Sequence, residues 1–212
     1  MTSLLPPIGS RASPRIVGLL GGIASGKSLV AGQLVAHGAG LLDADAAGHD
    51  VLLRPEVREA VRRRWGNGVF DATGHVVRPA LAKLVFADTP EARADLAHLE
   101  QITHPLIGEV LRERAITMAD LGTPLIVLDA PVMLKAGWDT LCDHLIFVDA
   151  PLEVRRERAR SRGWSDAEFA AREARQEPVE VKRRLADFVV DNSGSAGGTN
   201  LQITRLWPSL VG

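Results

Sequence analysis

The stretch Gly18–Leu29, GLLGGIASGKSL, decides the fold because a glycine-rich turn here joins an apolar run to a helical pattern. Gly21, four intervening residues and then Gly26-Lys27-Ser28 satisfy the P-loop spacing GxxxxGK[ST]. In such a loop, glycines let backbone N–H groups converge on a phosphate, and the following helix adds a favourable dipole. We expect Lys27 to reach the β- and γ-phosphates and the Ser28 hydroxyl to bind Mg²⁺. The stretch predicts a nucleoside triphosphate site; the alternative is a chance match in a glycine-rich turn.

Five apolar runs predict the strands of one sheet. They are RIVGLL from Arg15, GAGLLDAD to Asp45, PLIVLDA to Ala130, HLIFVDA to Ala150 and DFVVDN to Asn192. Near-continuous apolar runs are typical of parallel strands covered on both faces. Helical patterns lie between them, for example Ser28–His37, which Gly38 is placed to end. We therefore predict an α/β fold with a doubly wound parallel sheet of the P-loop NTPase type.

Two long segments depart from the simple alternation of strands and helices. Residues from about 51 to 121 are mostly helical in pattern and predict a helical insertion on the acceptor side. Residues from about 152 to 187 are dense in charge and predict a helical lid. Both are placed to leave the carboxyl edge of the sheet, where such folds bind ligands. We expect one kinase domain over 15–212, preceded by a flexible tail at 1–14.

The composition excludes several classes of protein. Lys and Arg number 25 and Asp and Glu 26, so a partner bound through phosphate neutralisation, such as a nucleic acid, is not expected. No apolar run is long enough to span a bilayer, and the first residues lack the pattern of a secretory signal. Cys142, the single cysteine, excludes an intramolecular disulfide. We expect a cytoplasmic monomer without membrane partners, although no apolar stripe in the sequence bears on the oligomeric state.

Carboxylates close three of the apolar runs. Asp43 and Asp45 follow the second run, where a kinase needs a base that activates its acceptor. The alternative is that both residues end a strand and cap the next helix. Asp129 and Asp149 close the third and fourth runs, and either resembles the magnesium-side Asp of P-loop enzymes. The choice between these two stays open at this point.

The segment Glu153–Asp187 carries nine Arg and one Lys against eight acidic residues. For most of these charges, a solvated helix face with pairs one turn apart explains the pattern. A few arginines are expected instead to close over the phosphates as the transferred group gains charge. The near balance of signs disfavours an RNA-binding stripe.

The order of motifs resembles the dephospho-CoA kinase family. The resemblance covers about residues 16–192 and rests on Gly21–Ser28, Asp43–Asp45, Gly74 to Arg78, His104-Pro105, LDAP ending at Pro131, Arg158, Arg162, Arg172, Gln176 and Val189–Asn192. It implies ATP-dependent phosphorylation of the ribose 3′-hydroxyl of dephospho-CoA, the last step of coenzyme A synthesis. The implied cofactors are ATP and Mg²⁺, and the implied partner is dephospho-CoA as a small-molecule substrate.

The resemblance also implies roles for particular residues. The catalytic set would be Asp45 as base, Lys27 and Arg158. The ATP-binding set would be Gly22, Ile23, Ala24, Ser25, Gly26, Lys27, Ser28, Leu29, Arg158 and Asn192, with Mg²⁺ held by Ser28 through ATP. The acceptor-binding set would be Asp43, Asp45, Arg78 and His104. From pattern alone, His104 is also explained as a histidine at a helix start before Pro105.

The chain departs from the family pattern at several positions. Ala24 replaces a usual glycine, which predicts that its backbone avoids positive φ. Leu29 stands where the family usually has Thr or Ser, so a side-chain hydroxyl is lost, and Lys135 stands where the family usually has Glu. Lys135 is the one feature that favours a nucleotide-binding regulatory module without transfer activity. A P-loop kinase of another small molecule, a nucleoside or a sugar, is the other alternative.

Overall fold

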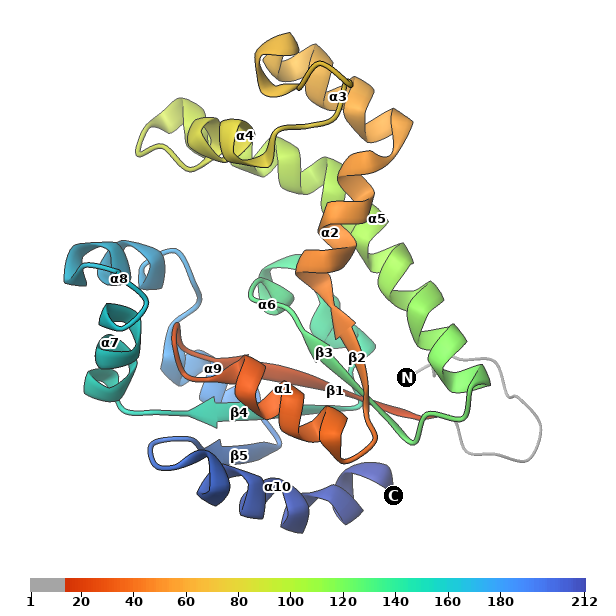
Figure 1. Cartoon of the computed structure of the whole chain (residues 1–212), viewed down its shortest axis with the longest axis vertical. Coiled ribbons are helices and arrows are strands. Elements are labelled where there is room, and N and C mark those ends of the chain that lie inside the picture. Colours follow the sequence, from red (N-terminus) through yellow and green to blue (C-terminus); the bar gives the residue numbers. More distant parts are fainter. Residues whose placement is uncertain (1–13) are drawn as a thin grey trace. The chain divides into compact units, whose positions relative to one another are not determined.

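The computed structural model describes residues 14–212, so the tail expected at 1–14 lies, apart from Pro14, outside the described residues. The described residues form a sheet of five parallel strands in the order β2-β3-β1-β4-β5 (Figure 1). The strands are β1 (Arg15–Gly21), β2 (Gly40–Asp43), β3 (Leu125–Asp129), β4 (His144–Asp149) and β5 (Phe188–Asp191). The predicted parallel sheet, with a strand in each of the five apolar runs, is confirmed.

Helices connect the strands. They are α1 (Lys27–Ala36), α2 (Ala44–Leu53), α3 (Pro55–Trp65), α4 (Arg78–Val85), α5 (Pro90–Asp120), α6 (Met133–Ala136), α7 (Leu152–Arg160), α8 (Asp166–Glu173), α9 (Val179–Leu185) and α10 (Ala196–Val211). Short 3₁₀ turns lie at η1 (Asn67–Val69) and η2 (Trp138–Leu141). Helix α1 ends as predicted, with Gly38 at φ 107° directly after the C-cap His37.

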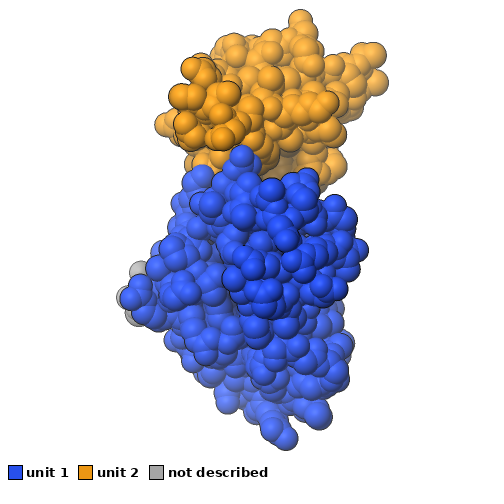
Figure 2. Space-filling model, turned by 90° about the vertical axis from the view of Figure 1, so that its left-hand side faces the viewer, with its two compact units in different colours: residues 1–43, 114–212 blue, residues 44–113 orange. Residues whose placement is uncertain are grey.

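The described chain divides into two compact units, shown in Figure 2. Unit 1 contains the described residues up to Asp43 together with Arg114–Gly212, and therefore holds the whole sheet. Unit 2 is Ala44–Glu113 and consists of α2, α3, α4 and the first part of α5. Within unit 2, Arg54 at the start of α3 lies 3.6 Å from Glu109 of α5.

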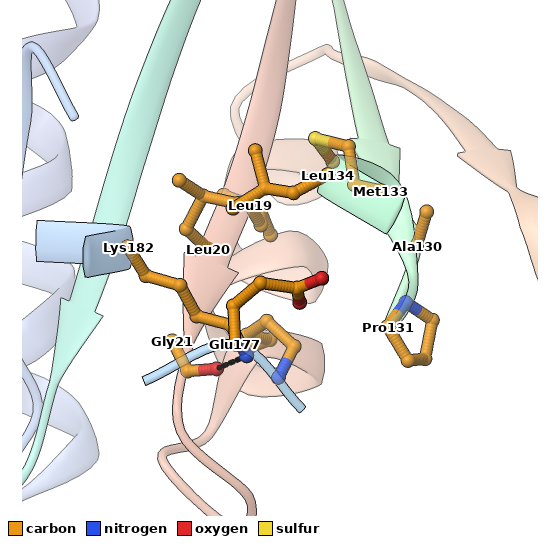
Figure 3. Close-up of a pocket in the computed structure, with 10 residues that line it drawn as sticks. Leu19, Leu20, Gly21, Ala130, Pro131, Met133, Leu134, Glu177 and Lys182 are labelled. Atoms are coloured by element: carbon orange, nitrogen blue, oxygen red, sulfur yellow. Dashed lines mark hydrogen bonds between the residues drawn. The ribbon is translucent and has the colours of Figure 1, made fainter. Parts of the chain in front are cut away.

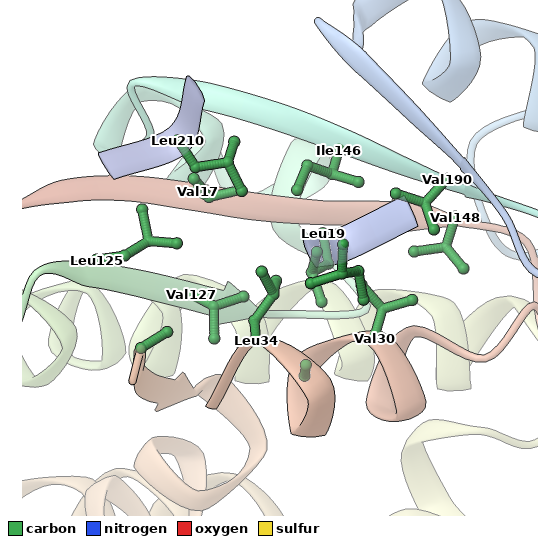
Figure 4. Close-up of a cluster of buried hydrophobic side chains, with 13 residues drawn as sticks. Val17, Leu19, Val30, Leu34, Leu125, Val127, Ile146, Val148, Val190 and Leu210 are labelled. Carbon is green, nitrogen blue, oxygen red and sulfur yellow. The ribbon is translucent and has the colours of Figure 1, made fainter. Parts of the chain in front are cut away.

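The core of unit 1 holds the phosphate loop in place. Val17 and Leu19 of β1 point to the same face of the sheet and pack with Val30 and Leu34 of α1 (Figure 4). All four side chains are fully buried, and each burial stabilises the fold by roughly 1.5–3 kcal/mol. On the opposite face, a Cβ at Gly18 would lie 2.8 Å from Sδ of Met133, so glycine lets α6 approach. The strand before the loop and the helix after it therefore share one rigid core.

The second strand is shorter than the sequence predicts. Its pairing with β3 ends at Asp43, opposite Asp129, and α2 begins at Ala44. Asp45 therefore lies in the first turn of a helix, and the prediction that the strand runs to Asp45 is wrong. The physical reason is the run of small helix-forming residues after Asp43, with an acid placed favourably at the positive end of the helix.

His104 lies inside a long helix. Helix α5 runs unbroken from Pro90 to Asp120 and includes Pro105 in its interior. The explanation of His104 as a residue at a helix start is therefore wrong. Pro105 has no N–H to donate to the carbonyl one turn earlier, and the length of α5 on both sides outweighs that loss.

Candidate active site

The phosphate loop joins β1 to α1. Ser25 donates its backbone N–H to the Gly22 carbonyl at 3.2 Å, and Leu29 donates to the Gly26 carbonyl at 3.0 Å. Gly26, the N-cap of α1, has φ 98°, and a Cβ here would overlap the side-chain amide of Asn192. Both the backbone conformation and the space require glycine. The loop thus presents the N-terminal N–H groups of α1 as a phosphate site.

Ala24 adopts the left-handed conformation, with φ 58°. The prediction that its backbone avoids positive φ is wrong. For an L-residue, this conformation costs about 1–2 kcal/mol. Ala24 is buried in a small cluster with Ala159 of α7 and Phe169 of α8, and Ile23 and Trp164 pack beside it. Packing between the loop and these helices therefore offsets the strain.

Lys27 lies where the motif predicts, at the first position of α1. Its Nζ lies 3.5 Å from the Gly22 carbonyl oxygen. Burial lowers the pKa of Lys27 from its ordinary value, and Asp129 opposes this shift while Arg155 and Arg162 add to it. A phosphate bound at this ammonium would favour its charged form.

Arg158 and Asn192 both reach the backbone of the phosphate loop. The Arg158 guanidinium donates to the Ser25 carbonyl at 3.1 Å and to the Asn192 carbonyl at 2.6 Å. The Asn192 side-chain amide donates to the same Ser25 carbonyl at 2.7 Å, and its oxygen accepts a hydrogen bond from Thr199 at 2.8 Å. Both side chains therefore hold the backbone of the loop, and their contact with ATP stays a prediction.

The strand-end carboxylates have different surroundings. Asp43 and Asp129 are direct neighbours across β2 and β3, at the carboxyl edge of the sheet. Asp149 forms an ion pair with Arg183 of α9. Of the two candidates for the magnesium side, Asp129 acts on Lys27 by its charge, and Asp149 is paired with Arg183. The choice between these two residues stays open.

The remaining acceptor-side residues belong to unit 2, whereas the phosphate loop belongs to unit 1. Asp45 lies in α2, Arg78 is the first residue of α4, and His104 lies in α5. Arg78 Nη1 lies 3.3 Å from Nδ1 of His49. The roles of these residues toward an acceptor stay predictions.

Two further cations, which no motif in the sequence singles out, contact the loop. Arg155 of α7 donates to the Ile23 carbonyl at 3.4 Å and forms an ion pair with Glu173. Lys182 of α9 lies 3.4 Å from the Gly21 carbonyl oxygen (Figure 3). Both are buried, with 6% and 3% of their surface exposed. Lys182 could have been singled out as the one lysine among nine arginines in its segment, whereas nothing in the sequence separates Arg155 from the other arginines.

The oxygen donors near the loop suit Mg²⁺. Ser28 is exposed at the start of α1, and Asp43 and Asp129 lie at the end of neighbouring strands of unit 1. Mg²⁺ is usually held by one or two protein oxygens together with substrate phosphates and water. Residues 14–212 contain no group of three His, Cys, Asp or Glu side chains that could hold a metal ion by itself.

A parallel sheet of this order, with the GxxxxGKS loop between β1 and α1, defines the chain as a P-loop phosphotransferase. The family model described as dephospho-CoA kinase matches residues 15–197, and the chain belongs to this family. In the described part of the chain, no helix is both long and apolar enough to cross a membrane.

The chain is similar to three known proteins over most of its length. The dephospho-CoA kinase of Anaeromyxobacter dehalogenans is 40% identical over 93% of this chain and 93% of its own length. That of Symbiobacterium thermophilum is 39% identical over 93% of this chain and 82% of its own length. The crystal structure of TT1252 from Thermus thermophilus has a TM-score of 0.78 and 35% identity, covering 95% of this chain and all of that chain.

Proposed function

We propose that this protein transfers the γ-phosphoryl group of ATP to the ribose 3′-hydroxyl of dephospho-CoA, giving coenzyme A and ADP. The observation that carries this proposal is a phosphate loop with intact Lys27 and Ser28 in a chain of the dephospho-CoA kinase family. The acceptor oxygen forms a bond to the γ-phosphorus of ATP. The bond between this phosphorus and the oxygen that joins it to the β-phosphorus breaks. The hydroxyl proton passes to a base on the protein.

On the donor side, we assign the phosphate contacts to the loop from Gly22 to Leu29. Its N–H groups and Lys27 bind the β- and γ-phosphates, and Arg158 with Asn192 keeps the loop backbone in the binding conformation. The Leu29 N–H donates to the Gly26 carbonyl at 3.0 Å, so a contact of this N–H with the α-phosphate would share or replace that bond. Ser28 and a strand-end carboxylate, Asp129 in this proposal, would hold Mg²⁺, which would supply positive charge to the phosphates.

On the acceptor side, we assign the base to Asp45, with Asp43, Arg78 and His104 as acceptor-binding residues. The support is the family resemblance and the place of Asp45 two residues beyond the end of β2. Phosphoryl transfer passes through a loose transition state, so the base takes the proton late and needs no raised pKa. An ordinary carboxylate that orients the hydroxyl is sufficient.

We also propose a cytoplasmic monomer that binds neither nucleic acid nor membranes. The support is the near balance of 25 basic and 26 acidic side chains, which leaves no excess charge for an anionic polymer or surface.

The proposal is tested by ADP release from Mg·ATP with dephospho-CoA, adenosine, gluconate or no acceptor. We expect acceptor-dependent release with dephospho-CoA alone. Turnover with adenosine or gluconate instead would indicate a kinase of another small molecule. ATP binding without any acceptor-stimulated release would indicate a regulatory module.

The base is tested separately by Asp45→Asn, with Asp50→Asn on the same helix α2 as the matched control. We expect Asp45→Asn to lower kcat by about 10²–10⁴-fold with ATP affinity nearly unchanged, because general-base catalysis contributes about that factor. The control should keep wild-type kinetics. Equal, small losses in both variants would contradict the assignment of Asp45.

A further inference from the structure

Lys182 is a buried lysine beside the phosphate loop. It lies on α9 with 3% of its surface exposed. Its Nζ lies 3.4 Å from the Gly21 carbonyl oxygen and donates to Oε1 of Gln176 at 2.7 Å. Figure 3 shows the side chain reaching from α9 to the end of β1. These acceptors account for two of its three N–H bonds within the described residues.

Lys182 and Lys27 line the same small pocket of unit 1. The pocket lies at the carboxyl end of β1 and β3, and Gly21, Pro131 and Glu177 also line it. Two ammonium groups on one buried surface repel each other and lose hydration. An anion in the pocket removes that cost, so the arrangement is one that binds negative charge.

Charged groups of α1, α7, α8 and the segment before α9 act on Lys182. Burial, followed by the charge of Lys27, lowers the pKa of Lys182 to about 8. Glu177 before α9 and Glu173 of α8 oppose the shift, whereas Arg155 of α7 adds to it.

Two strand-end carboxylates act on other cations near the loop. Arg183, next along α9, forms an ion pair with Asp149 of β4, and Asp129 of β3 acts on Lys27. Two cations and two carboxylates thus act on Lys182 together with burial, and a bound phosphate would counter burial and the charge of Lys27, the two largest causes of the shift.

We propose that Lys182 is a second phosphate-binding cation, whose ammonium contacts the transferred phosphoryl group together with Lys27. This inference rests on the proposed function. In phosphoryl transfer, charge is spread over the equatorial oxygens of the group in flight. Preorganised cations in a water-poor pocket stabilise that charge more than they stabilise bound ATP.

A purely structural role makes a different prediction. If Lys182 only ties α9 to Gly21 and Gln176, its loss would loosen the fold or the loop and weaken ATP binding. If it contacts the phosphoryl group in flight, its loss lowers kcat while the KM for ATP stays nearly constant. The split between kcat and KM therefore separates the two roles.

The first experiment compares Lys182→Met with Arg184→Met, an exposed cation on the same helix. We expect Lys182→Met to lower kcat by about 10²–10³-fold, the usual loss for one preorganised donor, with the KM for ATP within about threefold. Arg184→Met should match the wild type. A loss confined to KM, or equal kinetics in both variants, would overturn the proposal.

The second experiment measures kcat/KM against pH in the wild type, Lys182→Arg and Lys182→Met. Lys182 acts as a cation, so activity should fall as the pH rises through its pKa of about 8. This fall of kcat/KM at alkaline pH should move to higher pH in Lys182→Arg and disappear from the residual activity of Lys182→Met. If Lys182→Met shows the same alkaline fall as the wild type, the proposal is overturned, even if Lys182→Arg fails to fold.

A third measurement does not depend on the acceptor. Mg·ADP with aluminium fluoride, an analogue of the phosphoryl group in flight, should bind the wild type and Arg184→Met alike, and Lys182→Met at least about fivefold more weakly, whereas inorganic tripolyphosphate should bind all three within about threefold. Equal affinity of all three proteins for the aluminium fluoride complex would overturn the proposal. If the three proteins bind the complex in this pattern but the wild type does not phosphorylate dephospho-CoA, the proposed function fails and the anion site remains.

Discussion

At the scale of single residues, the phosphate loop is held by cations on its carbonyl oxygens. The donor and acceptor pairs are Lys182 with Gly21, Lys27 with Gly22, Arg155 with Ile23, and Arg158 with Ser25. These contacts fix the orientation of four peptide units of the loop. A loop backbone that is already fixed loses less conformational freedom when a phosphate binds.

Ala24→Gly tests the strain in the loop. The variant loses a buried methyl group but relieves the left-handed alanine, so we expect its free energy of unfolding to stay within about 1 kcal/mol of the wild type. Ala31→Gly is the matched control, because Ala31 is equally buried but lies within α1. It should lose about 1–2 kcal/mol. Urea denaturation with equal losses in both variants would contradict the strain at Ala24.

Residues with local signals could be predicted, and residues with distant partners could not. Lys27 and Ser28 follow from a motif of eight positions. The strained Ala24 and the buried Lys182 depend on contacts with residues 135 or more positions away along the chain, such as Ala159 and Gly21. Sequence pattern carries no signal for such contacts.

At the scale of elements, the turn from β5 to α10 fixes one side of the loop. Asn192 and Thr199 are each 1% exposed, and the Thr199 hydroxyl orients the amide that holds the Ser25 carbonyl. Removing this hydroxyl would leave the amide oxygen buried without its donor, which costs about 1–3 kcal/mol.

Thr199→Val should therefore destabilise the protein by about 1–3 kcal/mol and weaken ATP binding, because the amide of Asn192 loses its orientation. The control is Thr204→Val on the same helix, whose exposed hydroxyl donates to its own helix at Asn200. It should change stability by less than about 0.5 kcal/mol. If thermal and urea denaturation and ATP titration do not distinguish the two variants, the role given to Thr199 is wrong.

Helix α8 begins with a capping box that is sensitive to pH. Ser165 accepts a hydrogen bond from the Glu168 N–H, and the Glu168 carboxylate accepts from both the backbone N–H and the hydroxyl of Ser165. These bonds lower the pKa of Glu168 from its ordinary value. A lowered carboxyl pKa stabilises the folded state above its ordinary value, and the contribution is lost as the pH falls through the lowered value.

We therefore expect amide exchange in α8, corrected for intrinsic rates, to become faster as the pH falls below about 4. Ser165→Ala should accelerate it about fivefold at neutral pH and remove most of this pH dependence. The control is Ser195→Ala, which removes the N-cap of α10. Among the described residues, the Ser195 hydroxyl accepts only from the Gly198 N–H, so exchange in α10 should not become faster at acid pH. The same pH dependence in α10 would show that global acid unfolding is measured instead.

The elements themselves were largely predictable. Continuous apolar runs predict strands because both faces of the sheet are covered, and the end of α1 follows from Gly38. The end of β2 at Asp43 was not predictable, because pairing with β3 and the start of α2 compete for the same residues. The place of His104 inside α5 was not predictable for a related reason. Proline usually marks a helix start, but a long helix accommodates Pro105 in its interior.

At the scale of the whole molecule, the donor residues lie in unit 1, and Asp45, Arg78 and His104 lie in unit 2. We expect Mg·ADP to slow amide exchange in the loop and in α7 to α9 of unit 1, without direct protection of α3. Dephospho-CoA should protect parts of α2, α4 and α5. At 100 times its Kd, each ligand should raise the free energy of unfolding by about 2.7 kcal/mol. Protection of α3 by Mg·ADP alone would contradict this division of roles.

Transfer of labelled phosphate from γ-labelled Mg·ATP to dephospho-CoA tests the central claim most directly. The product is separated, and the position of its new phosphate is determined by mass spectrometry and ³¹P NMR. We predict one labelled phosphate on the ribose 3′ oxygen for each ADP formed, and none with Lys27→Ala. Label found only in inorganic phosphate, or on another hydroxyl, would contradict the proposed reaction.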